Sequence, residues 1–87
     1  MAYTIAFSES AEKQLRKLPQ HVQERVAQAL PLIASDPFLG HARKLAGHED
    51  LWRWRLGNYR IVYRVDQFRI HILVIRVGHR ANVYRGL

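Results

Sequence analysis

The sequence predicts a single α+β domain over residues 1–87, with the element order β-α-α-β-β-β and two helices packed on one face of a mainly antiparallel sheet. In the first half of the chain, apolar residues recur at the spacing of amphipathic helices, and from Leu51 onward they alternate with a period of two. The composition agrees, because 48% hydrophobic and 24% charged residues are typical of a globular protein.

The N-terminal half is expected to contain one strand and two helices. Residues 3–7 alternate and predict the strand, and Ser8 is placed to cap the first helix. Pro19 should end that helix and open the next one, in which Pro31 should cause a kink or an early end. The apolar stripes of the two helices are Ala11, Leu15 and Leu18, then Val22, Val26, Leu30 and Ile33.

The C-terminal half follows a loop at 36–50 and predicts strands at about 51–56, 59–65 and 69–76. Gly57-Asn58 is a preferred two-residue hairpin turn, and it would place Arg55 opposite Arg60. Opposed residues share a face of the sheet, so the register predicts an apolar face toward the helices and a basic face away from them. The apolar face would hold Trp52, Trp54, Leu56, Tyr59, Ile61 and Tyr63, joined by Ile70, Ile72 and Val74. The basic face would hold Arg53, Arg55, Arg60 and Arg64, joined by Arg69 and His71.

The net charge of +7 lies entirely in residues 51–87, which carry eight arginines against a single acid, whereas residues 1–50 carry six basic and six acidic side chains. The planar fork of arginine suits phosphate oxygens. Like charges opposed across two strands are unfavourable, so such a face either stands fully in water or binds a polyanion, and an all-arginine face favours the anion site. Nucleic acid and an acidic protein are the two partner classes, and neither excludes the other.

The sequence lacks the residues that thiol chemistry, metal binding and metal-dependent nuclease activity require. There is no cysteine, the five histidines show no metal-ligand spacing, and the basic half has no carboxylate pair. We therefore expect no metal or other cofactor, and any nuclease activity should be metal-independent. No apolar run is long enough for a membrane span and no signal peptide is evident, so we expect a cytoplasmic protein with no membrane partner.

The last residues, 77–87, break the strand alternation and bring together an imidazole, a guanidinium and a phenol: His79, Arg80 and Tyr84. All three groups occur in phosphoryl-transfer sites. A segment of this kind is also found as an ordinary polar terminus, so its interest depends on its lying beside the basic face.

Four stretches of the chain occur in a characteristic order and spacing: "LRKLP", "ARKLAG", "LWRWRLGNYRIVYRV" and "ILVIRVGHRANVYR". Through them the chain resembles the RelE/ParE toxin superfamily, on the RelE side, over nearly its whole length. The resemblance implies a type II toxin that enters the ribosomal A site and cleaves mRNA without a metal. The 2′-hydroxyl would attack the adjacent phosphorus and give a 2′,3′-cyclic phosphate and a 5′-hydroxyl. It also implies a RelB-like antitoxin that wraps and blocks the toxin, and operator DNA bound only through their complex.

The resemblance also carries residue roles. The basic catalytic positions of the family correspond to Arg53 and Arg55, where the best-known member has lysines, and to Arg60 and Arg80; its C-terminal tyrosine corresponds to Tyr84. Because arginine stays protonated in proteins, we expect Arg53 and Arg55 to bind substrate and not to accept protons.

The remaining roles follow from this division. Lys44 and Arg64 are further candidates for substrate binding. Arg80, with Arg60, would stabilise transition-state charge. Tyr84 would transfer protons or stack on a base, and His79 is a second candidate for proton transfer or a structural turn residue.

Two other functions stay open. The ParE branch shares the fold but poisons DNA gyrase, and its members tend to have longer first helices and to lack the full basic-plus-tyrosine set. The second alternative is a RelE-like fold that has lost cleavage and binds RNA or protein only, which the two arginines in place of lysines would permit.

Overall fold

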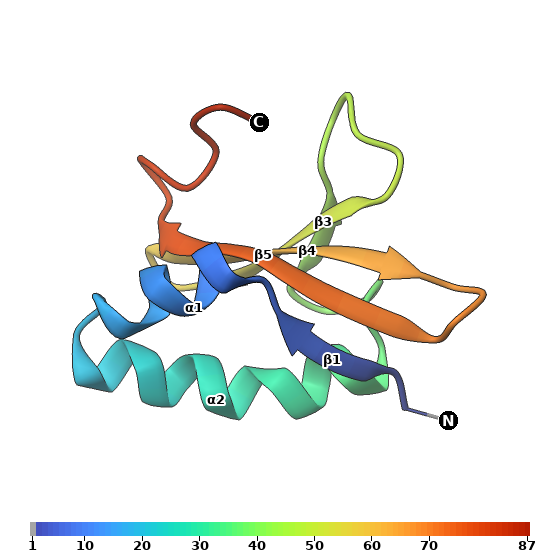
Figure 1. Cartoon of the computed structure of the whole chain (residues 1–87), viewed down its shortest axis with the longest axis horizontal. Coiled ribbons are helices and arrows are strands. Elements are labelled where there is room, and N and C mark those ends of the chain that lie inside the picture. Colours follow the sequence, from blue (N-terminus) through green and yellow to red (C-terminus); the bar gives the residue numbers. More distant parts are fainter. Residues whose placement is uncertain (1) are drawn as a thin grey trace.

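The computed structural model describes residues 2–87 and contains a five-stranded sheet with both helices on one face (Figure 1). The elements are β1 (Thr4–Phe7), α1 (Glu9–Arg16), α2 (Gln20–Ser35), β2 (Ala42–Lys44), β3 (Leu51–Leu56), β4 (Tyr59–Asp66) and β5 (His71–His79). The strand order is β1-β5-β4-β3-β2; β1 runs parallel to β5 and every other pair is antiparallel. The predicted fold class is confirmed, with β2 as an additional strand inside the segment that was expected to be a loop.

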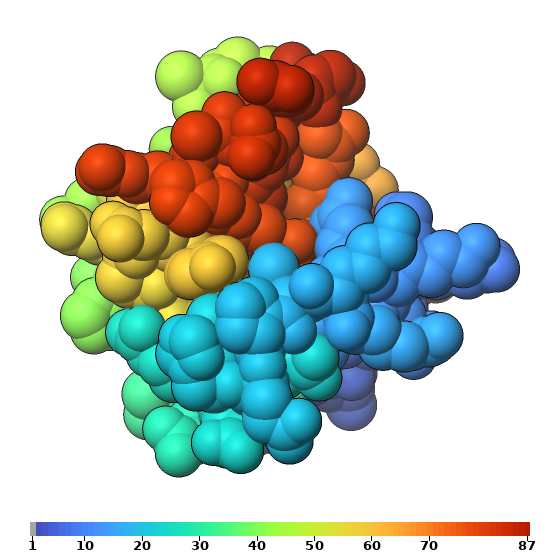
Figure 2. Space-filling view, turned by 90° about the vertical axis from the view of Figure 1, so that its left-hand side faces the viewer, coloured from blue at the N-terminus to red at the C-terminus, as the bar shows by residue number. Residues whose placement is uncertain are grey.

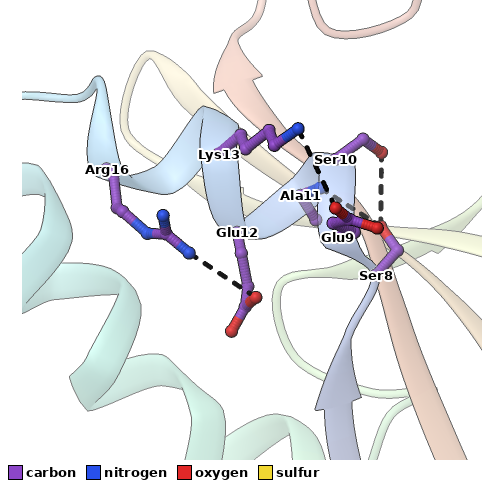
Figure 3. A network of polar contacts seen from close by, with 7 residues as sticks. All are labelled: Ser8, Glu9, Ser10, Ala11, Glu12, Lys13 and Arg16. Atoms are coloured by element: carbon purple, nitrogen blue, oxygen red, sulfur yellow. Dashed lines mark hydrogen bonds and ion pairs between the residues drawn. The ribbon is translucent and has the colours of Figure 1, made fainter.

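The first helix begins as predicted. The Ser8 hydroxyl accepts a hydrogen bond from the backbone N–H of Ala11 at 3.1 Å, which satisfies one free donor of the first turn (Figure 3). Two exposed ion pairs lie on the helix surface, each between residues one turn apart. Ion pairs of this kind contribute little to stability. The side-chain oxygen of Gln14 accepts from the N–H of Val77 at 3.0 Å and so joins α1 to the last strand. The ion pairs are Glu9–Lys13 and Glu12–Arg16.

The second helix continues past Pro31, so of the expected kink or early end, the early end does not occur. Proline lacks the N–H that would bond the carbonyl four residues earlier, that of Ala27. Both residues are exposed, so water can bond to that carbonyl and the helix continues to Ser35. Pro19 precedes α2 as its N-cap residue, as predicted, whereas α1 already ends at Arg16.

The core lies between the helices and the apolar face of the sheet. Trp54 is 4% exposed and Ile61, Tyr63, Ile72 and Val74 are fully buried, as the hairpin register predicted. The buried hydroxyl of Tyr63 donates to the carbonyl of Pro37 at 2.7 Å, so this polar atom has a partner inside the core. The helices contribute Ala11, Val22, Val26, Ala29 and Ile33, and Leu15, Leu30 and Trp52 pack against the core while partly exposed.

The β3–β4 hairpin has the predicted register throughout. Arg55 lies opposite Arg60, Trp54 opposite Ile61 and Leu56 opposite Tyr59. The turn glycine, Gly57, has a φ of 62°, which a glycine adopts without strain.

The β4–β5 pair departs from simple alternation at one point. Tyr63 lies opposite Val74 but Val62 lies opposite Arg76, so Ile75 is an extra residue on β5. A β-bulge of this kind shifts every later side chain of the strand to the other face. Beyond the bulge, Val77 enters the core and Arg76 and Gly78 turn to the face away from the helices.

The last strand is also displaced along the sequence from its prediction. It spans His71–His79 and not 69–76, so Arg69 and Ile70 belong to the preceding turn. Ile70 has a φ of 52°, a left-handed conformation that is unfavourable for a β-branched residue. The turn projects Phe68, which is 102% exposed, at the end of the hairpin opposite to the C-terminal segment (Figure 1).

Candidate active site

Six arginines lie on the side of the sheet that the helices leave open, and we call this surface the arginine face. The C-terminal segment after β5 and the loop between β2 and β3 rise from the same side (Figure 1). Because opposed residues share a face, the strand registers place these six side chains together. They are Arg43, Arg53, Arg55, Arg60, Arg64 and Arg76.

The arginine face has an apolar floor, which corrects the expectation of an all-arginine surface. Leu51 and Val62 alternate in register with the arginines and are 2% and 0% exposed. Val83 of the C-terminal segment is 5% exposed. An ideal Cβ placed on Gly78 would lie 3.7 Å from the Cβ of Val83, an ordinary van der Waals distance, so Val83 packs directly against this part of the sheet. The arginines therefore extend from a packed surface that restricts their stems.

Arg53 lies at the centre of this face. Its guanidinium donates to the carbonyl of His41 at 3.0 Å. Partial burial lowers the pKa of Arg53 from its ordinary value, the nearby Tyr84 raises it, and the neighbouring guanidiniums of Arg60, Arg43 and Arg55 lower it. Arg43 lies opposite Arg53, and Arg55 and Arg60 lie on the same face, so a bound anion would reduce the repulsion among these guanidiniums.

Arg60 is held beside the hairpin turn. Its Nη1 donates to the carbonyl of Gly57 at 2.7 Å and to that of Tyr59 at 2.8 Å. Arg60 is the second residue of β4, directly after the turn. Its fixed orientation comes from these two carbonyls.

Lys44 was a candidate for substrate binding, but the structure places it on the other face. It lies opposite Trp52, whose ring packs against the core, whereas its neighbour Arg43 lies opposite Arg53. Arg43 is therefore the member of this pair on the arginine face, and it was not predicted because β2 falls in the segment that was expected to be a loop.

Arg64 lies on the arginine face but already has an acidic partner. Its Nε lies 2.8 Å from a carboxylate oxygen of Asp50. Asp50 comes from the loop before β3, so an acid outside residues 51–87 offsets one of the arginines. Asp66 itself pairs weakly with Arg69 in the β4–β5 turn, at 3.8 Å.

His79 also lies away from the arginine face. The bulge in β5 turns its side chain to the helix side, where it lies opposite Tyr59 and packs edge-on against that ring with centroids 5.6 Å apart. Its Nδ1 accepts the N–H of Ala81 at 3.2 Å. These contacts fit the structural role in the turn and remove His79 from the set of residues that surround Arg53.

The C-terminal segment brings Tyr84 to the face and Arg80 to its edge. Tyr84 is half-buried and follows Val83, which is buried against Gly78 on this face. The backbone N–H of Arg80 donates to the carbonyl of Asn58 at 2.8 Å, so Arg80 starts at the same hairpin turn that holds Arg60. Figure 2 shows this turn, in yellow, between the red C-terminal segment and the cyan N-terminal part of α2.

Within residues 2–87, no three His, Asp or Glu side chains gather in a way that could hold a metal ion. Across the same residues, no helix is both long enough and apolar enough to cross a bilayer. What the arginine face offers chemically is a set of fixed positive charges, several backbone-anchored, with one phenol among them.

Comparison with known proteins gives consistent results. The profile of a family described as the ParE toxin of type II toxin–antitoxin systems matches residues 5–84. Toxin RelG of Mycobacterium tuberculosis is 34% identical over 92 residues, which cover 98% of this chain and 99% of that protein. The mRNA interferase toxin RelE of Escherichia coli is 37% identical over 88 residues, covering 97% of this chain and 92% of that protein.

Solved structures agree on the fold. A toxin–antitoxin complex of the RelBE type from Mycobacterium tuberculosis contains a chain that matches with a TM-score of 0.83 at 28% identity, covering 92% of this chain and 100% of that one. The intact RelBE toxin–antitoxin complex of Escherichia coli matches with a TM-score of 0.80 at 34% identity, covering 90% and 96%.

Proposed function

Since this chain belongs to the RelE/ParE superfamily, as a RelE-like toxin of a type II toxin–antitoxin system, we propose that it is a ribosome-dependent, metal-independent mRNA endoribonuclease. The observation that carries the proposal is the gathering of Arg43, Arg53, Arg55 and Arg60 on the open face of the sheet, to which the segment that carries Tyr84 is fastened at Val83. The related protein from Escherichia coli is named an mRNA interferase, which supports RNA as the substrate class.

The proposed reaction uses a nucleophile that the RNA itself supplies. The ribose 2′-oxygen loses its proton as it bonds to the adjacent phosphorus, the bond from phosphorus to the 5′-oxygen breaks, and the 5′-oxygen takes up a proton. The products are a 2′,3′-cyclic phosphate and a 5′-hydroxyl. No metal-bound hydroxide is required, because the attacking oxygen belongs to the substrate.

The arginines would stabilise the negative charge of the phosphate during this reaction. The pentacoordinate transition state carries more negative charge on its non-bridging oxygens than the ground state, and fixed donors aimed at those oxygens lower the barrier. We assign this role to Arg60 and Arg80, which both lie at the β3–β4 turn. Arg53 and Arg55 would hold the substrate phosphates, and Arg43 joins them in place of Lys44.

Tyr84 is the proposed group for proton transfer or for stacking on a displaced base. Guanidiniums stay protonated and cannot accept the proton of the 2′-hydroxyl. Tyr84 lies between Val83 and Arg85, whose carbonyls bond to Arg76 on the arginine face, and it is half-buried, so part of it is open to a ligand. Either role places it in contact with the nucleotide at the cleaved bond.

The proposed partners follow from the family. A RelB-like antitoxin would bind the toxin and block the arginine face, and operator DNA would be bound through that complex. Matched chains of known structure occur in such toxin–antitoxin complexes. The ribosomal A site and its mRNA would be the target, which places the site of action in the cytoplasm.

The test is cleavage of mRNA on programmed ribosomes, mapped by primer extension, with purified toxin in the presence of EDTA. We expect cuts in the A-site codon that disappear when the cognate antitoxin is added. Inhibition of DNA gyrase with no RNA cuts would favour the ParE-like alternative. Binding to ribosomes with neither effect would favour the non-cleaving alternative.

A further inference from the structure

The C-terminal segment after β5, residues 80–87, is attached to the arginine face at two points. Val83 is buried against the bare backbone of Gly78. Beside it, Nη1 of Arg76 donates to the carbonyl of Val83 at 3.3 Å and also to the carbonyl of Arg85. A terminal segment without helix or strand is usually mobile unless it is tied down, and these contacts tie it to the sheet.

The two carbonyls that Arg76 bonds belong to the residues on either side of Tyr84. Fixing both positions leaves the tyrosine little freedom apart from rotation of its own side chain. Arg76 reaches these carbonyls because the bulge at Ile75 turns it to the arginine face; simple alternation from Val74 would have turned it into the core.

We propose that Arg76 is a positioning residue that holds Tyr84 at the arginine face for RNA cleavage. The proposal rests on the function proposed above. Arg76 uses its guanidinium on protein carbonyls and contributes to the reaction through Tyr84. A displacement of about 1 Å in a reacting group can reduce a rate by about 100-fold, so a clamp on both sides of this residue has a measurable consequence.

The test uses Arg76→Met, which keeps an apolar stem and removes the donors. Arg69→Met is the matched control, because Arg69 is an exposed arginine in the turn at the far end of β4 and β5. Single-turnover cleavage on programmed ribosomes should fall by about 10- to 100-fold in Arg76→Met at saturating toxin, with ribosome affinity changed less than about 3-fold. Arg69→Met should cleave at the wild-type rate, and Arg76→Lys should lie between.

A double-mutant cycle with Tyr84→Ala separates positioning from an independent role. If Arg76 acts through Tyr84, Arg76→Met should cause no further loss of rate in a chain that already carries Tyr84→Ala. Losses that multiply would overturn the proposal, and so would a loss confined to ribosome affinity, which would mean that Arg76 binds phosphate itself.

Hydrogen exchange tests the clamp without any activity. The N–H groups of Arg85 and Leu87 are bonded within the segment, to the carbonyls of Asn82 and Tyr84. Their exchange should accelerate by at least about 10-fold in Arg76→Met but not in Arg69→Met, while exchange of the β4 amides stays unchanged. Unchanged exchange at Arg85 and Leu87 would overturn the proposal. A wild-type protein that shows the expected exchange but cuts no RNA would contradict only the proposed function.

Discussion

The surroundings of Arg53 determine what each residue of the site can contribute. Arg60 and Arg43 flank it with fixed positive charge, while Tyr84 brings an oxygen that can exchange a proton. In the proposed mechanism, the arginines hold charge and Tyr84 moves a proton or stacks. This division is what single substitutions can test.

Tyr84→Phe separates the two roles of the tyrosine, because it keeps the ring and removes the hydroxyl. Loss of a general acid or base typically lowers a rate by about 10²–10⁴-fold, so Tyr84→Phe should fall within this range if Tyr84 transfers a proton. If Tyr84 stacks on a base, Tyr84→Phe should cleave normally while Tyr84→Ala loses activity. Single-turnover cleavage on programmed ribosomes distinguishes the two. His79→Gln serves as the control, and a loss as large as that of Tyr84→Ala would contradict its placement on the helix side.

Arg60 and Arg80 should affect the rate of cleavage more than binding. Removing one fixed donor to a transition-state oxyanion typically costs about 2.7–4 kcal/mol, or about 100- to 1,000-fold in rate. We expect Arg60→Ala and Arg80→Ala to show such losses at saturating toxin, whereas Arg53→Ala and Arg55→Ala mainly weaken ribosome binding. Full activity in the Arg60→Ala, Arg80→Ala double variant would contradict the assignment and favour the non-cleaving alternative.

At the scale of elements, the β3–β4 hairpin explains both what the sequence predicts and where prediction stops. Gly57-Asn58 sets the turn, and alternation then determines the face of Trp54 and Arg55. No comparable signal marks the bulge at Ile75, because one extra residue in an apolar strand leaves the hydrophobic pattern intact. His79 was therefore expected beside the arginines, and Arg76 was missed.

The edge strand β2 also could not be predicted from the sequence. β2 has three residues, too few for a periodic signal, and it forms through pairing with β3. Without that pairing, Arg43 and Lys44 could not be assigned to opposite faces. The apolar floor under the arginines also depends on Val83, whose contact with Gly78 joins the end of β5 to the segment that follows it. A contact of this kind produces no recognisable pattern in the sequence.

Tyr63 links the sheet to the loop after α2, and it gives a pH-dependent prediction. Burial, and secondarily Asp36, raise the pKa of Tyr63 well above its ordinary value, while Arg53 lowers it. The folded chain therefore holds this proton more tightly than the unfolded chain does. Its contribution to stability is fully present below about pH 10, the ordinary tyrosine pKa, and is lost as pH rises above it.

The measurement is urea unfolding of wild type and Tyr63→Phe between about pH 7 and about pH 11, a range that spans the ordinary tyrosine pKa. At neutral pH the variant should be less stable by about 1–3 kcal/mol, because the buried carbonyl of Pro37 loses its donor. Above about pH 10 the difference should shrink, by up to about 1.4 kcal/mol per pH unit. A difference that stays constant across this range would mean that Tyr63 ionises equally in both states.

At the scale of the whole molecule, the two faces of the sheet have separate tasks. The helices cover one face and form the core, which leaves the other face free to carry charge. The excess of +7 is therefore concentrated on the open face and around its edges, and not spread over the surface. Such a concentration raises the local density of polyanions and accelerates their association at low ionic strength.

If the arginine face binds RNA phosphates, affinity should fall steeply with salt. Each phosphate of a single strand that is neutralised contributes about 0.7 to the slope of log affinity against log salt concentration. The structure ranks the arginines for this experiment. Arg55 is exposed and should lower the slope by about 0.7 when replaced by alanine, whereas Arg64 is already paired with Asp50 at 2.8 Å and should lower it by less.

Binding of a short single-stranded RNA, measured by fluorescence anisotropy between about 50 and 200 mM salt, tests both statements. Equal effects of Arg55→Ala and Arg64→Ala would show that the Asp50 pair opens when RNA binds, and an affinity independent of salt would exclude the arginine face as the RNA surface.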